Sequence, residues 1–181
     1  MRARYQIINH RIEAARQYSS PHTSPRSGGE VSLIVLHCIS LPAGHFGGRY
    51  VEDLFMGTLS GQAHEDFADL TAARVSAHLL IRRCGALLQF VAFDQAAWHA
   101  GTSSYLGRQG CNDFSIGIEL EGTDTAPYSE IQYVVLGSVV SALQDHYQMP
   151  TSAVVGHMDI APGRKTDPGP AFEWEKFWHC C

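Results

Sequence analysis

Residues 31–37 read VSLIVLH, and this stretch decides the fold class. It is apolar almost throughout and rich in β-branched side chains, which is the pattern of a strand that is covered on both faces. We therefore expect it to be a central strand of a sheet. Its last residue, His37, brings an imidazole to the end of that strand, where sheets of this class commonly bind ligands.

Apolar stretches elsewhere in the chain predict the rest of the sheet. Residues 75–81 and 86–93 are apolar and flank a short charged stretch that contains glycine, which predicts a β-hairpin. Residues 114–121, FSIGIELE, alternate apolar with small or polar side chains and predict another strand. We expect this strand to have a polar end, because Glu119 and Glu121 lie there.

Helical patterns supply the layers around the sheet. Residues 50–55 have apolar positions at helical spacing, and Ser129 with Gln132 forms a capping box before the longest helical pattern of the chain. The apolar strand 153–155 follows and completes a strand-helix-strand unit, which is normally parallel. Residues 172–178, FEWEKFW, predict a last helical turn that docks on the body. The fold class is therefore α/β or α+β.

Composition and charge limit the classes of partner. The chain has 181 residues, 45% of them hydrophobic, which is enough for the core of one structural domain. A formal net charge of −5 without a clustered basic surface argues against nucleic acid as a partner. Residues 1–30 are expected to wrap the domain, and their part 19–30, rich in Ser, Pro and Gly, to form the loop that leads into residues 31–181.

Cysteines and apolar runs indicate the compartment. The five cysteines are an odd number without the spacing of a disulfide framework, which favours reduced thiols. Residues 1–22 contain no apolar core of a signal peptide, and no apolar run approaches the roughly 20 residues that span a bilayer. We therefore expect a cytoplasmic protein without a membrane partner.

Two histidines lie where predicted strands end. His37 closes 31–37 and His157 follows 153–155, so both imidazoles meet at one sheet edge if the strands are neighbours. Asp167 follows ten residues after His157, in a segment too rich in Pro and Gly to be helical. Two neutral imidazoles and a carboxylate are a ligand set of catalytic zinc. The spacing alone leaves another interpretation open, because single histidines are more often buried, hydrogen-bonded core residues.

Five stretches, in this order, resemble one protein family: LIVLHCISLPAGHFGG, RVSAHLLIRR, AWHAGTSSYLGR, CNDFSIGIELEGTD and GHMDIAPGRKTDPGP. The family is that of the cytosolic anhydro-N-acetylmuramoyl-L-alanine amidases of the AmpD type, and the resemblance covers nearly the whole chain. It implies one domain with a mixed central β-sheet flanked by helices, a fold similar to that of peptidoglycan-recognition proteins and small phage amidases. Residues 31–181 would then be a zinc amidase domain.

The resemblance also implies a reaction and the residues for it. The substrate would be an anhydro-muropeptide, cut at the amide between the lactyl group of 1,6-anhydro-N-acetylmuramic acid and L-alanine during peptidoglycan recycling, with an indirect role in β-lactamase regulation. One Zn²⁺ per chain would be held by His37, His157 and Asp167. Glu119 would transfer protons, and Lys165 would place positive charge beside the oxyanion. Without the resemblance, these two residues are more simply a solvated carboxylate at a strand end and a surface charge on a loop.

Four further residues are candidates for substrate binding. Arg74 and Arg108 carry guanidinium groups, which can bind peptide carboxylates through two parallel hydrogen bonds. Trp98 and Tyr105 are aromatic residues that would line a sugar or peptide cleft. The alternative is that the arginines are solvated at the surface and that the aromatic residues belong to the core.

Two positions depart from the family pattern. Cys38 follows the first ligand where relatives commonly have asparagine, and it would place a spare thiolate near the zinc. At Gly110 some relatives have arginine, so carboxylate recognition would depend more on Arg74 or Arg108.

Two further histidines and two alternative functions also have to be considered. His78 and His99 lie in the matching stretches, but we place both outside the catalytic set, because a strand histidine beside apolar neighbours is more often packed. The alternatives in function are a broad-specificity peptidoglycan amidase and a non-catalytic muropeptide-binding module. The lack of a signal peptide core argues against the first, and the complete ligand set argues against the second. We expect a monomer.

Overall fold

A six-stranded mixed sheet forms the centre of the computed structural model, which describes residues 5–181. Residues 1–4 of the expected N-terminal segment therefore lie outside the described residues. The strand order is β12-β5-β11-β6-β7-β3, with β12 at Val154–Gly156, β5 at Leu33–Ile39, β11 at Ser115–Glu121, β6 at Leu79–Ile81, β7 at Leu87–Gln89 and β3 at Arg16–Gln17. All neighbours are parallel except β6 and β7, so the expected central strand and the expected hairpin are both found.

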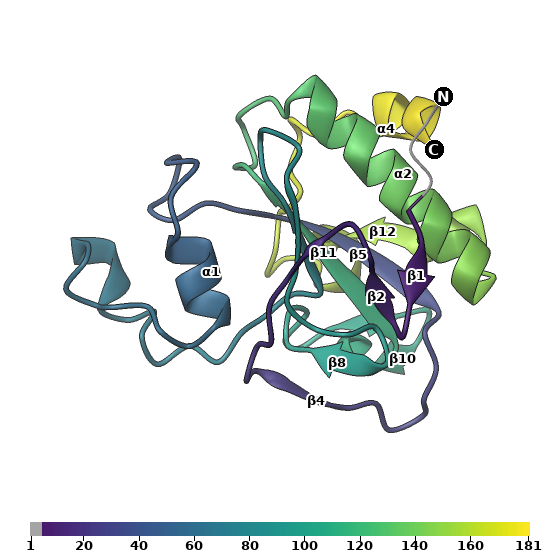
Figure 1. Cartoon of the computed structure of the whole chain (residues 1–181), viewed down its shortest axis with the longest axis horizontal. Coiled ribbons are helices and arrows are strands. Elements are labelled where there is room, and N and C mark those ends of the chain that lie inside the picture. The colour runs from purple at the N-terminus through teal and green to yellow at the C-terminus, as the bar shows by residue number, and fades with distance from the viewer. Residues whose placement is uncertain (1–4) are drawn as a thin grey trace.

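Helices cover both faces of this sheet (Figure 1). They are α1 at Tyr50–Phe55, α2 at Glu130–Tyr147, α3 at His157–Ile160 and α4 at Trp174–Cys180, with short 3-10 turns at Glu65–Phe67, Cys111–Asp113 and Thr151–Ala153. Strand β6 shows how the layers divide. Leu79 and Ile81 belong to the apolar cluster that contains the inner face of α2, whereas Leu80 belongs to the cluster that contains α1. Because successive strand residues point to opposite faces, α1 and α2 lie on opposite sides of the sheet.

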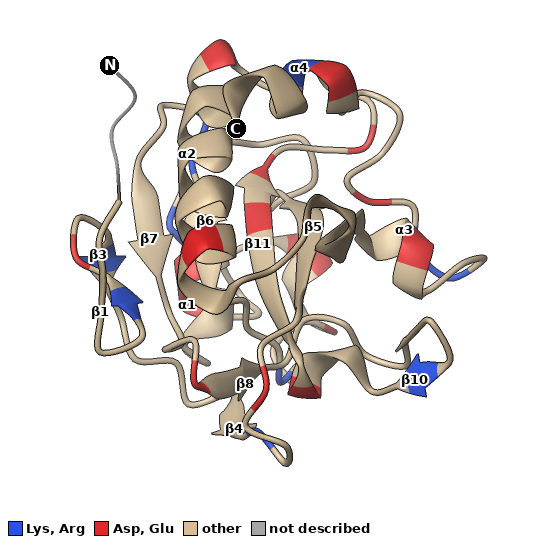
Figure 2. Ribbon diagram, turned by 90° about the vertical axis from the view of Figure 1, so that its right-hand side faces the viewer, with Lys and Arg blue, Asp and Glu red and all other residues tan. Residues whose placement is uncertain are grey.

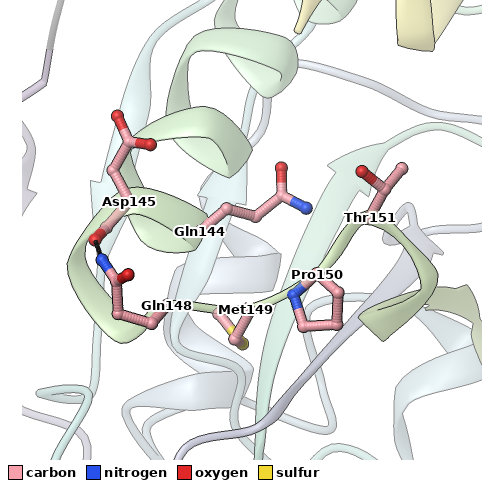
Figure 3. Close-up of a pocket in the computed structure, with 6 residues that line it drawn as sticks. All are labelled: Gln144, Asp145, Gln148, Met149, Pro150 and Thr151. Carbon is pink, nitrogen blue, oxygen red and sulfur yellow. Dashed lines mark hydrogen bonds between the residues drawn. The ribbon is translucent and has the colours of Figure 1, made fainter.

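The capping box predicted for α2 is present. The Ser129 hydroxyl accepts from the backbone N–H of Gln132, and the Gln132 side chain accepts from the backbone N–H of Ser129 at 3.0 Å. The helix ends at Tyr147, and the side-chain amide of the next residue, Gln148, donates to the Asp145 carbonyl at 2.6 Å (Figure 3). Because β11 and β12 both pair parallel with β5, α2 connects parallel strands that lie on either side of β5. The predicted parallel strand-helix-strand unit is therefore found, with β5 between its strands.

The N-terminal residues contribute strands rather than only a loop. Residues 19–30 were expected to be irregular from their Ser, Pro and Gly content, but Thr23–Pro25 forms β4, which pairs antiparallel with β8 at Gln95–Ala97. Thr23 also donates through its hydroxyl to the Ala96 carbonyl at 3.0 Å. The pairing partner lies far away in the sequence, so local composition does not reveal it. Two further short hairpins join β1 (Ile7–Ile8) to β2 (Arg11–Ile12) and β9 (Ser104–Tyr105) to β10 (Arg108–Gln109).

Strand β11 is buried along its whole length, so its expected polar end is not a solvated one. Figure 2 shows its acidic residues in red, well inside the fold. The Glu121 carboxylate accepts hydrogen bonds from the Arg82 guanidinium and from the backbone N–H of Gly47, at 2.7 Å for the latter. Arg82 also donates to the Glu52 carboxylate of α1. This buried ion-pair network joins α1 to the sheet.

The distribution of charge and the length of the helices bear on two classes of partner that the sequence argued against, nucleic acid and membranes. In Figure 2 the blue Lys and Arg segments are distributed over separate elements, among them β10 and the loop after α3. Among residues 5–181, no helix is both long enough and apolar enough to cross a bilayer.

Candidate metal centre

Three potential metal ligands converge at the ends of neighbouring strands. The Nδ1 atoms of His37 and His157 are 2.9 Å apart, and each lies 3.0 Å from Oδ2 of Asp167. The side chains are buried, with exposed fractions of 1%, 3% and 9% for the three residues in that order. We call these atoms the donor triangle.

The fold places each donor for a local reason. His37 lies near the end of β5, and His157 directly follows β12, which pairs with β5 in register Gly156 to Leu36. Asp167 is held beside them because its carbonyl accepts from the Met158 N–H at 3.0 Å. The two histidine strands are therefore neighbours, a point that the sequence left open.

The chemistry of the donor triangle fits a cation. Burial lowers the pKa of His37 to about 4, so this imidazole is neutral at pH 7 and can offer a lone pair. Burial acts to raise the pKa of Asp167, but the close contacts with the imidazoles of His157 and His37 outweigh it and hold that pKa below its usual range. A carboxylate oxygen and the unprotonated nitrogen of an imidazole are both hydrogen-bond acceptors, so their lone pairs lie close together at these short separations. Two nitrogens and one oxygen also match the ligand set of an open zinc site, so the residues fit the implied Zn²⁺.

Glu119 lies beside the donor triangle with one free oxygen. It is the β11 residue paired with His37 in the sheet register, and among the described residues its Oε2 atom has no hydrogen-bond partner. Burial raises the pKa of Glu119 well above its usual value, and the charge of Asp167 adds to this, while Lys165 opposes it. The group is therefore poised to hold or release a proton, unlike the solvated strand-end carboxylate of the simpler interpretation.

A cleft of about 490 Å³ opens over these groups. Its lining includes the donor triangle, Glu119, the exposed Lys165 and the half-buried Trp98. The Trp98 indole donates to the Ser24 hydroxyl at 3.2 Å and stacks on His22 with 6.0 Å between ring centroids. Strand β4 thus fixes one wall of the cleft.

Three predicted substrate-binding residues are absent from the described lining of this cleft. Tyr105 donates to the Ser152 carbonyl at 2.9 Å and packs on the apolar cluster around Phe114. Arg108 pairs with Glu30 at 2.8 Å and lies over the Phe114 ring, 3.9 Å from its centroid. Arg74 is exposed, one residue before the lining residue Val75.

Sequence reasoning missed several residues of the lining. Arg164 donates to the carbonyls of Ala100 and Thr102, each at 2.7 Å, and Thr166 donates to the Asp124 carboxylate. Arg164, Thr166 and Asp124 line the cleft because their loops, far along the chain from β5, fold beside it. The repeated Pro and Gly of the segment around Asp167 signalled an imposed loop shape, but not its neighbours.

Cys38 and two histidines also lie close to the site. Burial raises the pKa of the Cys38 thiol, so it stays protonated and donates to Asp124 at 3.2 Å instead of offering the thiolate that was expected near the metal. His78 is packed as expected, accepting from the Gly117 N–H at 3.1 Å. His99, in contrast, lines the cleft and contacts His37.

A second depression, of about 410 Å³, lies at the end of α2 (Figure 3). Its lining consists of Gln144, Asp145, Gln148, Met149, Pro150 and Thr151. It offers a single carboxylate and no histidine, so it lacks the paired groups on which metal binding or acid-base chemistry depends.

Comparisons with known proteins identify a family, similar sequences and similar structures. The sequence profile of the N-acetylmuramoyl-L-alanine amidase family matches residues 27–170. The 1,6-anhydro-N-acetylmuramyl-L-alanine amidase AmpD of Escherichia coli strain K12 is 56% identical over 167 residues, covering 92% of this chain and 91% of that protein. A crystal structure of a selenomethionine derivative of AmpD superposes with a TM-score of 0.95 at 50% identity, covering 97% of this chain and 98% of that one.

A more distant structure contains a substrate. It is the N-acetylmuramyl-L-alanine amidase AmiD from E. coli in complex with the substrate anhydro-N-acetylmuramic acid-L-Ala-D-gamma-Glu-L-Lys. It superposes with a TM-score of 0.61 at 29% identity, covering 87% of this chain and 58% of that one.

Proposed function

The chain belongs to the N-acetylmuramoyl-L-alanine amidase family, and from that premise we propose that it is a zinc-dependent amidase acting on anhydro-muropeptides. The bond cut is the amide between the lactyl group of 1,6-anhydro-N-acetylmuramic acid and L-alanine. The observation that carries the proposal is the donor triangle with the buried Glu119 directly beside it. The 92% coverage by a relative named for this activity supports the substrate class.

The proposed roles follow from the chemistry of each group. His37, His157 and Asp167 would hold one Zn²⁺, a Lewis acid that would activate water and polarise the amide carbonyl when bound. Glu119 accepts a proton from the attacking water at its free Oε2 and passes it to the nitrogen of the departing L-alanine, which must not leave as an amide anion. Lys165, exposed at the cleft, places positive charge near the oxyanion that develops on the carbonyl.

Substrate binding follows from the cleft walls. Trp98 presents an aromatic face held by Ser24 and His22, which suits contact with a sugar ring. Arg74 lies one residue before the lining residue Val75 and remains our candidate for a peptide carboxylate. Arg108 and Tyr105, which have partners away from the cleft, would contribute only if the bound peptide extends toward them.

The cellular setting completes the proposal. We infer that the protein acts as a monomer in the cytoplasm, in peptidoglycan recycling, without nucleic acid or membrane as partner. By lowering the level of anhydro-muropeptides it would influence β-lactamase regulation indirectly. The reduced state of all five cysteines in the structure is compatible with that compartment.

Hydrolysis of purified anhydro-N-acetylmuramoyl-L-alanyl peptide tests the proposal. We expect release of the L-alanyl peptide, loss of activity with a chelator and recovery when Zn²⁺ is added back. Zinc binding without cleavage would instead support a non-catalytic muropeptide-binding module. Equal activity on intact sacculi would support the broad-specificity peptidoglycan amidase.

A further inference from the structure

The two-residue segment His99–Ala100 contacts both histidines of the donor triangle at their Nε2 atoms. The Nδ1 atom of His99 lies 2.9 Å from Nε2 of His37, and the Ala100 carbonyl oxygen lies 3.3 Å from Nε2 of His157. Each contact is made to the ring nitrogen that faces away from the triangle. One short segment therefore determines how both imidazoles present their other nitrogen.

A chain of hydrogen bonds gives the His37 contact a direction. The Ser115 hydroxyl donates its one hydrogen to the Cys111 carbonyl at 2.6 Å, so its oxygen accepts from Nε2–H of His99 at 3.1 Å. A neutral His99 with its hydrogen on Nε2 has a lone pair on Nδ1. That lone pair accepts from Nε2–H of His37, and Nδ1 of His37 is left with a lone pair facing the triangle.

The contact of His157 fixes its tautomer in the same way, through a single hydrogen bond. A carbonyl oxygen only accepts, so the Ala100 carbonyl requires the hydrogen of His157 to be on Nε2. The Nδ1 atom of His157 therefore also carries a lone pair. Both rings are set in the tautomer that binds a cation through Nδ1.

The segment itself is rigidly held. The side-chain oxygen of Asn112 accepts from the backbone N–H of both His99 and Ala100, at 3.1 and 2.7 Å. Gly117 of β11 leaves room for the imidazole, because a Cβ atom there would lie 2.4 Å from Cγ of His99. No real Cβ tolerates such a distance, so the position of the ring depends on this glycine.

We propose that His99 is a positioning residue for the metal centre, acting through His37, and that Asn112 holds the segment by which both histidines are oriented. The inference rests on the proposed zinc site and adds to it the residues that prepare the site before the metal arrives. Outer partners of metal-bound histidines fix ring orientation and tautomer in this way, and their loss weakens metal binding by about 10- to 100-fold. His99 thus has a role beyond the packing that its sequence context suggested.

Substitution of His99 by Asn and by Leu tests the proposal with two side chains of similar size. His99→Asn offers an oxygen near the position of Nδ1, whereas His99→Leu offers no acceptor. We expect the dissociation constant for Zn²⁺, measured by competition with a chromophoric chelator, to rise about 10- to 100-fold in His99→Leu and much less in His99→Asn. Nitrogen NMR of the metal-free protein should show His37 with its hydrogen on Nε2 in the wild type and His99→Asn, and a mixture of tautomers in His99→Leu.

A second pair of variants tests the contacts of Asn112 with the backbone of His99 and Ala100, and it replaces the first pair if His99→Leu does not fold. Asn112→Asp keeps the accepting oxygen and Asn112→Ala removes it, so zinc affinity should fall in Asn112→Ala and stay close to that of the wild type in Asn112→Asp. Wild-type affinity and tautomer in His99→Leu, or equal losses within each pair, would overturn the positioning role. Wild-type protein that binds no zinc would instead defeat the proposed function.

Discussion

Glu119 of β11 lies directly opposite His37 of β5 in the parallel ladder between these strands. The register puts an acid with a free oxygen and a metal-type ligand on the same face of the sheet, away from α2. Because the two roles that we propose, proton transfer and metal binding, fall to different side chains, they can be perturbed separately.

Replacing Glu119 by Gln should remove turnover without removing zinc. The amide has nearly the same shape but cannot accept and return a proton, so kcat/KM should fall by about 10² to 10⁴-fold. Zinc content measured by atomic emission should match that of the wild type. A variant that loses its zinc would show that Glu119 supports the ligands rather than the proton transfer.

The same substitution should change how stability depends on pH. Without metal, the pKa of Glu119 is raised in the folded protein, so the folded chain binds more protons than the unfolded one between about pH 4.3 and that raised value. Wild-type stability therefore falls as pH rises through this window, whereas Glu119→Gln avoids the loss. In chelator, the variant should have the higher Tm at pH 7, and the two curves should meet below about pH 4. A Tm difference that is independent of pH would contradict the raised pKa.

Replacing Asp167 by Ala should remove zinc itself. The substitution deletes the one carboxylate of the donor triangle and leaves two imidazole nitrogens. We expect the zinc that stays bound after gel filtration to fall from about one per chain toward zero, because a catalytic zinc site depends on all three protein ligands. Asp94→Ala, a change at an exposed carboxylate, is the matched control and should keep its zinc. Full zinc in both variants would exclude Asp167 as a ligand.

Replacing Arg82 by Ala should strongly destabilise the fold. Its side chain is 9% exposed and lies between the carboxylates of Glu52 and Glu121, which would be left buried without a cation. We expect a loss of about 3 to 5 kcal/mol in the free energy of unfolding, measured with urea. Arg108→Ala is the control, because its side chain is 43% exposed and its pairing with Glu30 should contribute less than about 1 kcal/mol. Equal losses in the two variants would refute the burial argument.

Replacing Gly137 by Ala should destabilise the protein although alanine favours helices. Gly137 lies within α2, and a Cβ atom there would be 2.2 Å from the Cys180 carbonyl oxygen of α4. Displacing α4 should cost about 1 to 3 kcal/mol, more than the roughly 1 kcal/mol gained in helix propensity. The control is Val134→Ala on the exposed side of α2. Urea unfolding followed by tryptophan fluorescence measures both, and a stabilised Gly137→Ala would show that α4 does not need this contact.

Local patterns were sufficient for the elements that carry the donor triangle. The β-branched run that ends at His37 gave the central strand, and Ser129 with Gln132 gave the start of α2. The connection through α2 predicted that the strand before His157 belongs to the same sheet as β11, whereas its place directly beside β5 is known only from the structure. These features depend on residues close together in sequence, or on a general rule of parallel connections.

Other features depend on contacts that no local pattern encodes. Thr23–Pro25 forms a strand only because Gln95–Ala97 is available to pair with it. Glu121 resembles a surface carboxylate until Arg82 is placed beside it. The role of His99 was missed for the same reason, since its partner His37 lies in a distant strand.

The position of β5 between β11 and β12 has a consequence for biosynthesis. Chains are made from the N-terminus, so His37 leaves the ribosome long before His157 and Asp167, the other corners of the triangle. Until His157 and Asp167 have been made, a nascent chain therefore carries only one of the three donors of the proposed cation site. The zinc site that we propose can therefore form only after residue 167 has been synthesised, and a product terminated before Asp167 would lack one of its ligands.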